Sequence, residues 1–182
     1  MNFLFRISKM YTPDFLKKKE LVKLSRVTAS VFDTAIPSMT GLSFKECLAT
    51  FARFTASNVD DAINKGNNLQ AIQDKLYHGA YEIGVRIRKQ FHVADASDVM
   101  EASRFLYRIL GIDFEGTEQG AIVISECFFS QYYSSSQCRV ISSLDAGLIA
   151  GLSNGGEMKF LERITEGSPF CKAQVQFKEQ FS

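Results

Sequence analysis

The sequence predicts an α+β domain in which helices pack on an antiparallel sheet. Apolar residues recur at helical spacing up to Gly111, whereas alternating segments and tight turn signals follow it. No strand–helix–strand alternation of the kind that builds a parallel sheet occurs. We therefore expect four helices, a hairpin, a helix and a second hairpin. At 182 residues the chain is the size of one domain, 1–182, with a mainly helical part, 1–111, and a hairpin–helix–hairpin part, 112–182.

The first two helices have clear start signals. Thr12 as N-cap and Pro13 at the first helical position predict a helix that ends before Pro37. Ser43 and Glu46 have the spacing of a capping box, which predicts the start of the second helix.

The next two helices are bounded by small and polar residues. Gly66 is placed to end the second helix, and the third begins near Asn68. Ser97 is the expected N-cap of the fourth helix, which Gly111 ends.

The second half alternates in the manner of strands. Residues 112–114 and 121–128 predict two strands around a turn at 116–120, and the serines at 134–136 start a further helix. The final hairpin spans 158–177 around the turn Glu-Gly-Ser-Pro.

Strict alternation raises a question about the carboxylates in these hairpins. It places Glu162 on the face of Met158, Phe160 and Ile164, and Glu126 on the face of Ile122, Ile124 and Phe128. A buried carboxylate needs a partner, because isolated charge is costly to bury. Glu162 is then a general acid or base, a metal ligand or a ligand anchor. The alternative is that it meets Arg163 or Lys172 in water.

Composition narrows the function classes. The net charge is +1 and the only basic run is Lys17–Lys19, so we expect no nucleic-acid binding. No apolar stretch is long enough to span a membrane. The four cysteines form no Cys-x-x-Cys pair and predict reduced thiols in the cytoplasm. No phosphate-binding loop or His-Glu-x-x-His motif occurs, and neither His78 nor His92 adjoins a nucleophile motif.

A polar cluster is expected between the last helix and the last hairpin. Cys138 and Asp145 are seven residues apart and so share a helical face. If this helix packs over the hairpin, Cys138, Glu162 and Cys171 converge. Thiolates and a carboxylate are credible zinc ligands, but a closed zinc site needs four. The alternative is that both cysteines are small buried apolar residues.

The run from Cys127 to Phe177, CFFSQYYSSSQCRVISSLDAGLIAGLSNGGEMKFLERITEGSPFCKAQVQF, resembles the C-terminal half of vinyl-reductase-type ligand-binding domains. The shared pattern is an aromatic-rich segment, a cysteine in a helix, Gly-Leu at its end, and Glu…Gly-x-x-x-Cys in the hairpin. The resemblance extends to about residue 70. These domains share a fold superfamily with trafficking-complex (TRAPP) subunits and with aminothiazoline-carboxylate hydrolase-like proteins, so the chain resembles those proteins as well.

The resemblance implies an α+β domain that encloses an apolar pocket and often forms dimers. In the aromatic-sensing branch it implies zinc held by Cys138, Glu162 and Cys171. Thr165 stands where the remaining cysteine is expected, and Cys127 is the possible substitute. The hydrolase-like branch favours an aspartate shortly after the helix cysteine, which points to Asp145.

Three functions follow as hypotheses. The first is a cytoplasmic sensor or carrier domain that binds a hydrophobic small molecule, as a homodimer, in an apolar pocket. We expect the aromatic side chains at the ligand to be Phe105, Phe128, Tyr132 and Phe160. The second is a hydrolase of a small heterocyclic or amide substrate that uses Cys138, Asp145 and Glu162. The third is a structural dimerisation module.

Overall fold

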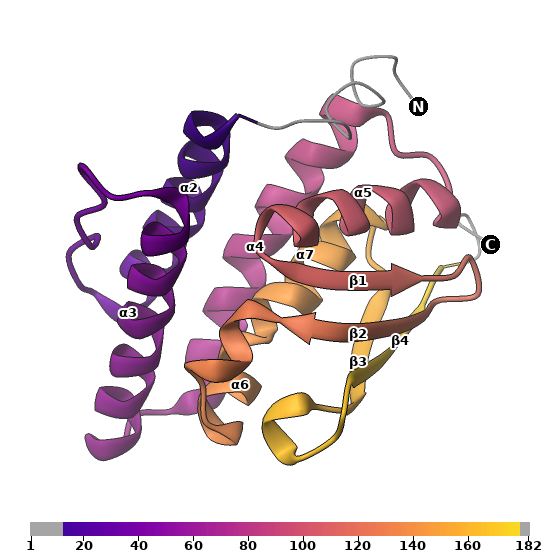
Figure 1. Cartoon of the computed structure of the whole chain (residues 1–182). Helices are drawn as coiled ribbons and strands as arrows, with labels where there is room; N and C mark the ends of the chain where they lie inside the picture. Colours follow the sequence, from indigo (N-terminus) through magenta and orange to yellow (C-terminus); the bar gives the residue numbers. More distant parts are fainter. Residues whose placement is uncertain (1–12, 179–182) are drawn as a thin grey trace.

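The computed structural model describes residues 13–178, and these residues confirm the predicted α+β class and element order. The helical part contains α2 (Asp14–Phe32), α3 (Phe44–Asn64), α4 (Leu69–Phe91) and α5 (Ala96–Ile109). The second part contains β1 (Ile112–Gly116), β2 (Ala121–Cys127), the 3₁₀ turn η1 (Phe128–Gln131), α6 (Ser135–Ile141), α7 (Ser143–Leu152), β3 (Glu157–Glu162), the 3₁₀ turn η2 (Ile164–Glu166) and β4 (Cys171–Gln176). In Figure 1, α2 and α3 lie side by side at the left, the sheet lies at the right, and α4 and α7 cross the middle. None of the helices within residues 13–178 is long and apolar enough to cross a membrane.

Capping side chains fix the helix starts. In α3 the Glu46 carboxylate accepts from the Ser43 backbone N–H at 2.7 Å, and Ser43 Oγ accepts from the Glu46 N–H, as predicted. Asn68 caps α4 as expected. The expected cap of α5 was wrong: Asp95, not Ser97, accepts from the Asp98 N–H at 2.8 Å. Thr12 lies outside the described residues.

The four strands form one antiparallel sheet in the order β1-β2-β4-β3. Alternate residues of each strand face the helices and form the main core with Phe51 of α3 and Ile149 of α7. The inward residues are Ile112, Phe114, Ile122, Ile124, Cys171, Ala173, Val175 and Met158. The other face carries mostly exposed side chains, among them Val123 and Leu161. The sheet is thus covered on one face, and any enclosed site lies between that face and the helices.

Two β-bulges reverse the predicted direction of the hairpin glutamates. Phe160 pairs with Ala173, but Glu162 pairs with the next residue, Lys172, so two residues of β3 oppose one of β4. This shift takes Glu162 off the Phe160 face and onto the outer face. A second shift in the β1–β2 pair places the exposed Glu126 opposite Asp113. The expected inward faces of both glutamates were therefore wrong, because a bulge breaks the two-residue period on which the expectation rested.

The fifth predicted helix is divided at Ser142. The backbone there has ψ −6°, and the Asp145 N–H bonds to the Ser142 carbonyl three residues back, as in a 3₁₀ turn. The division separates α6 from α7 but leaves Cys138 and Asp145 on the same side of the α6–α7 segment. The predicted strand through Thr165 also ends early, because residues 164–166 turn into η2.

Candidate functional site

A cavity of about 90 Å³ lies between the inner face of the sheet and helices α2, α3, α6 and α7. Its apolar wall consists of Leu24, Phe51, Leu110, Ile112, Phe129, Ile141, Leu144 and Ile164. Its polar groups come from Cys127, Ser130, Tyr133, Cys138, Ser142, Asp145, Thr165 and Cys171. A mainly apolar hollow with a few polar groups is typical of a small-molecule site.

Asp145 supplies the charge at this cavity. The Tyr107 hydroxyl donates to Asp145 Oδ1 at 2.7 Å. Burial raises the pKa of Asp145 to about 6, against the opposing effects of the Tyr107 hydrogen bond and the nearby Arg163 guanidinium. Burial and the neighbouring carboxylate raise the pKa of Tyr107 well above its usual range, so the phenol stays protonated and keeps donating.

Three of the four cysteines, all of them free thiols, border the cavity. Burial raises the pKa of the Cys127 thiol to about 12. Burial also raises the pKa of Cys138 and of Cys171. It outweighs the Thr165 hydroxyl, which lowers the pKa of Cys138, and the Ile164 N–H, which donates to Cys171 Sγ at 3.4 Å and lowers the pKa of that thiol. All three are therefore protonated near neutral pH and behave as apolar wall groups.

Arg163 and Thr165 lie beside this cluster. The Arg163 guanidinium donates to Ser142 Oγ at 3.2 Å and lies 4.4 Å above the Phe160 ring centroid. Arg163 Nε is buried without a hydrogen-bond partner in the described chain, and the buried Thr165 hydroxyl has only the Cys138 thiol beside it. A buried donor of this kind is uncommon in a native protein and is able to bond to a water molecule or to a ligand.

The structure brings together four of the predicted polar residues and leaves one out. Cys127, Cys138, Asp145 and Cys171 border one cavity, although they come from different elements. Glu162 lies on the outer face, where it accepts from Lys172 Nζ at 2.8 Å and from Ser168 Oγ at 2.9 Å, and these bonds lower its pKa. This is the exposed alternative that the sequence left open. Within residues 13–178 no three His, Cys, Asp or Glu side chains are placed to hold a metal ion, so the zinc set gains no support.

The predicted aromatic residues do not line the cavity. Phe105, Phe128, Tyr132 and Phe160 are partly buried and pack around the core, whereas Phe129 and Tyr133 reach the cavity. The stacked rings of Phe129 and Tyr133, with centroids 5.8 Å apart, form part of its wall. The signal that could have found them is their i, i+4 spacing. The Tyr133 N–H bonds to the Phe129 carbonyl at 3.2 Å, so one helical turn that continues past η1 brings the two rings to the same side.

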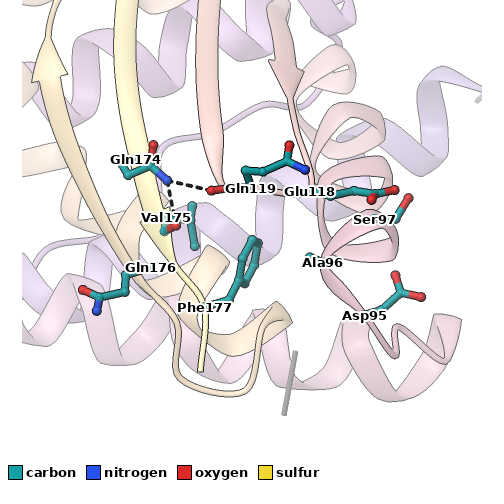
Figure 2. Close-up of a pocket in the computed structure, with 9 residues that line it drawn as sticks. All are labelled: Asp95, Ala96, Ser97, Glu118, Gln119, Gln174, Val175, Gln176 and Phe177. Atoms are coloured by element: carbon teal, nitrogen blue, oxygen red, sulfur yellow. Dashed lines mark hydrogen bonds between the residues drawn. The ribbon is translucent and has the colours of Figure 1, made fainter. Parts of the chain in front are cut away.

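A larger hollow of about 790 Å³ is found elsewhere, beside the first turn of α5. Figure 2 shows polar side chains around it from the start of α5, from the turn between β1 and β2, and from β4. Gln174 Nε2 donates to the carbonyl oxygens of Gln119 and Val175, and Asp95 caps α5. The two carboxylates of this hollow, Asp95 and Glu118, are exposed to solvent, so it offers a less enclosed site than the cavity at Asp145.

Comparison with solved structures finds a protein of similar fold. The chain is similar to trafficking protein particle complex subunit 3 from Naegleria fowleri, whose crystal structure shows it covalently bound to palmitic acid. The TM-score is 0.53 at 14% sequence identity, and the match covers 76% of this chain and 99% of the other. The chain has the TRAPP-type fold. No protein-family model matches the sequence, and no curated protein matches it.

The raised pKa of Asp145 predicts a measurable pH dependence. Because the folded-state pKa lies above that of an unfolded aspartate, the native state binds more protons between about pH 4 and pH 6, and stability falls as pH rises through this window. Asp145 should account for about 2 to 3 kcal/mol of this fall. Urea unfolding of the wild type and of Asp145→Asn, from pH 4 to pH 7, measures it. The difference between the two free energies of unfolding should change across the window, and a constant difference would contradict the burial of this carboxyl.

Proposed function

We propose that this chain binds a small, mainly apolar molecule in the cavity at Asp145 and acts as a sensor or carrier domain. The observation that carries the proposal is the pairing of an apolar wall with polar groups gathered from α6, α7 and η2. A site of this composition favours an apolar ligand, while its few polar groups orient the ligand.

The size of the cavity supports a small ligand. An apolar cavity of about 150 Å³ takes up benzene, and this cavity is smaller, at about 90 Å³. Palmitic acid, which the Naegleria protein carries, is several times larger than benzene and does not fit this cavity without a rearrangement of its walls. We therefore propose a short-chain or small-ring ligand for this chain.

Filling the cavity tests the proposal. Ile164 is partly buried on η2 and borders the cavity, so Ile164→Phe should occupy the space and weaken binding of n-butanol at least tenfold. Chemical-shift titration of the backbone amides of Cys127, Ser130 and Ser142 measures this binding. Ile63→Phe makes the same change at a position that is 38% exposed on α3 and should leave binding unchanged. No saturable shifts in the wild type, or equal binding by both variants, would refute the site.

A hydrolase is the second candidate. Asp145 favours it, since a carboxylate with a pKa of about 6 beside a cavity suits a general base. The raised pKa of Cys138 counts against a thiolate nucleophile. Glu162 is bonded to Lys172 on the outer face of the sheet and cannot act in the cavity, so Asp145 alone supports a hydrolase function.

The compartment and the assembly are also part of the proposal. Four free thiols suit a reducing compartment such as the cytoplasm. A homodimer, as the family resemblance implies, stays a prediction.

A further inference from the structure

We infer that the cavity selects ligands with a cationic head: a short alkyl or small-ring amine whose ammonium group pairs with Asp145. The inference rests on the proposed function and adds to it the chemical class of the ligand.

The charge of the cavity wall carries the inference. Asp145 is the one ionisable carboxylate among the described residues that line the cavity, and no lysine, arginine or histidine lines it. The three thiols there are neutral because burial raises each thiol pKa. An anionic ligand would face this carboxylate, whereas a cationic one would neutralise it.

The hydrogen bonds of Asp145 leave it able to accept another donor. Tyr107 donates to Oδ1, and no other donor within the described chain bonds to this side chain. A carboxylate has about four acceptor positions, so one bond leaves most of them unused. An ammonium group at the second oxygen would supply the missing donors and the opposite charge, and a charge-assisted bond of this kind is roughly twice as strong as a neutral one.

Arg163 is a cation of the protein itself that competes with a cationic ligand for Asp145. Its guanidinium lowers the pKa of Asp145, so its field reaches the carboxylate. It is held outside the cavity, however, by Ser142 and by the Phe160 ring, and it does not line the wall. Burial outweighs its influence, because the net shift of the Asp145 pKa is upward. Since Arg163 bonds to Ser142 and stacks on Phe160, the described wall of the cavity itself supplies no cation to the carboxylate, and a cationic ligand would supply one.

The shape of the wall sets the rest of the ligand. Phe51, Ile141 and Leu144 line the same cavity as the carboxylate. The volume of about 90 Å³ is below that of a benzene-binding cavity. An unbranched alkylamine has about the same volume as benzene but a narrower cross-section than the benzene ring. n-Butylamine is therefore the simplest probe that combines an ammonium head with a thin apolar chain.

Three probes of nearly equal shape test the inference: n-butylamine, n-butanol and butyrate. Each is titrated at pH 7.5, where the amine is protonated and Asp145 is ionised, and binding is followed by backbone amide shifts. We expect n-butylamine to bind at least tenfold more tightly than n-butanol, and butyrate to bind most weakly. In Asp145→Asn, which keeps the shape and the acceptor for Tyr107, this preference should disappear. Glu162→Gln removes a carboxylate from the outer face and should leave it unchanged.

The outcomes separate the two proposals. If n-butanol binds at the cavity as well as the amine does, or if Asp145→Asn keeps the preference, charge selection is refuted and the small-molecule site stands. If none of the three probes shifts the cavity amides, the proposed function is refuted together with the inference.

Discussion

Gly84→Ala is expected to lower the free energy of unfolding by about 2 to 3 kcal/mol, because α4 and α7 are in backbone contact at this point. A methyl group at Gly84 would clash with the Leu148 carbonyl oxygen and would lie 2.9 Å from Gly151 Cα. Backbone atoms in the middle of a helix cannot move aside singly, so the two helices would have to separate. The higher helix propensity of alanine offsets only about 1 kcal/mol of this cost. Thermal unfolding should show a midpoint lowered by roughly 5 to 10 °C.

Gly79→Ala is the matched control on the same helix. Its added methyl group would meet only side-chain atoms of Val27, which is partly buried and can adjust. The gain in helix propensity then nearly balances the crowding, and the change in stability should stay within about 1 kcal/mol. Equal losses in both variants would show that the close approach of α4 and α7 is not what Gly84 provides.

Phe51→Ala is expected to have the largest effect on both stability and binding. Phe51 is 2% exposed, its ring meets Phe129 edge-on at 6.1 Å, and it forms one wall of the cavity. Its truncation should cost about 3 to 5 kcal/mol. It should also enlarge the cavity enough to admit benzene. Benzene should therefore raise the unfolding midpoint of the variant and not that of the wild type.

Phe15→Ala removes the same ring from a position that is 69% exposed on α2. Its stability should change by no more than about 0.5 kcal/mol, and benzene should have no effect on it. If Phe51→Ala leaves too little folded protein to measure, Phe51→Leu is expected to show the same benzene effect at a smaller loss of stability. Absence of that effect in both Phe51 variants would contradict the location of the cavity.

The local parts of the fold could be predicted from the sequence because they depend on neighbouring residues. The capping box of Ser43 and Glu46 is a contact between residues three apart, and its geometry follows from the helix itself. The seven-residue spacing of Cys138 and Asp145 likewise survived the division between α6 and α7. The placing of Cys171 at the same cavity followed from its alternation with Ala173 and Val175 on the regular part of β4.

The errors arose where the backbone departs from a regular period. Glu162 and Glu126 were assigned to inner faces by strict alternation, and one bulge in each strand pair moved them outward. Phe128 was read as the last residue of a strand, but it begins the 3₁₀ turn η1, and the cavity is lined by Phe129 and Tyr133 rather than by Phe128 and Tyr132. The pairing of Tyr107 with Asp145 joins residues 38 positions apart, and no short-range pattern predicts it.

The most direct test of a cation-selective cavity at Asp145 is a crystal structure of the protein saturated with n-butylamine. We expect density for one molecule in the cavity, with the amine nitrogen within hydrogen-bond distance of the second Asp145 oxygen and the alkyl chain against Phe51. A cavity that stays empty at saturation, or an amine bound only elsewhere on the molecule, would contradict it.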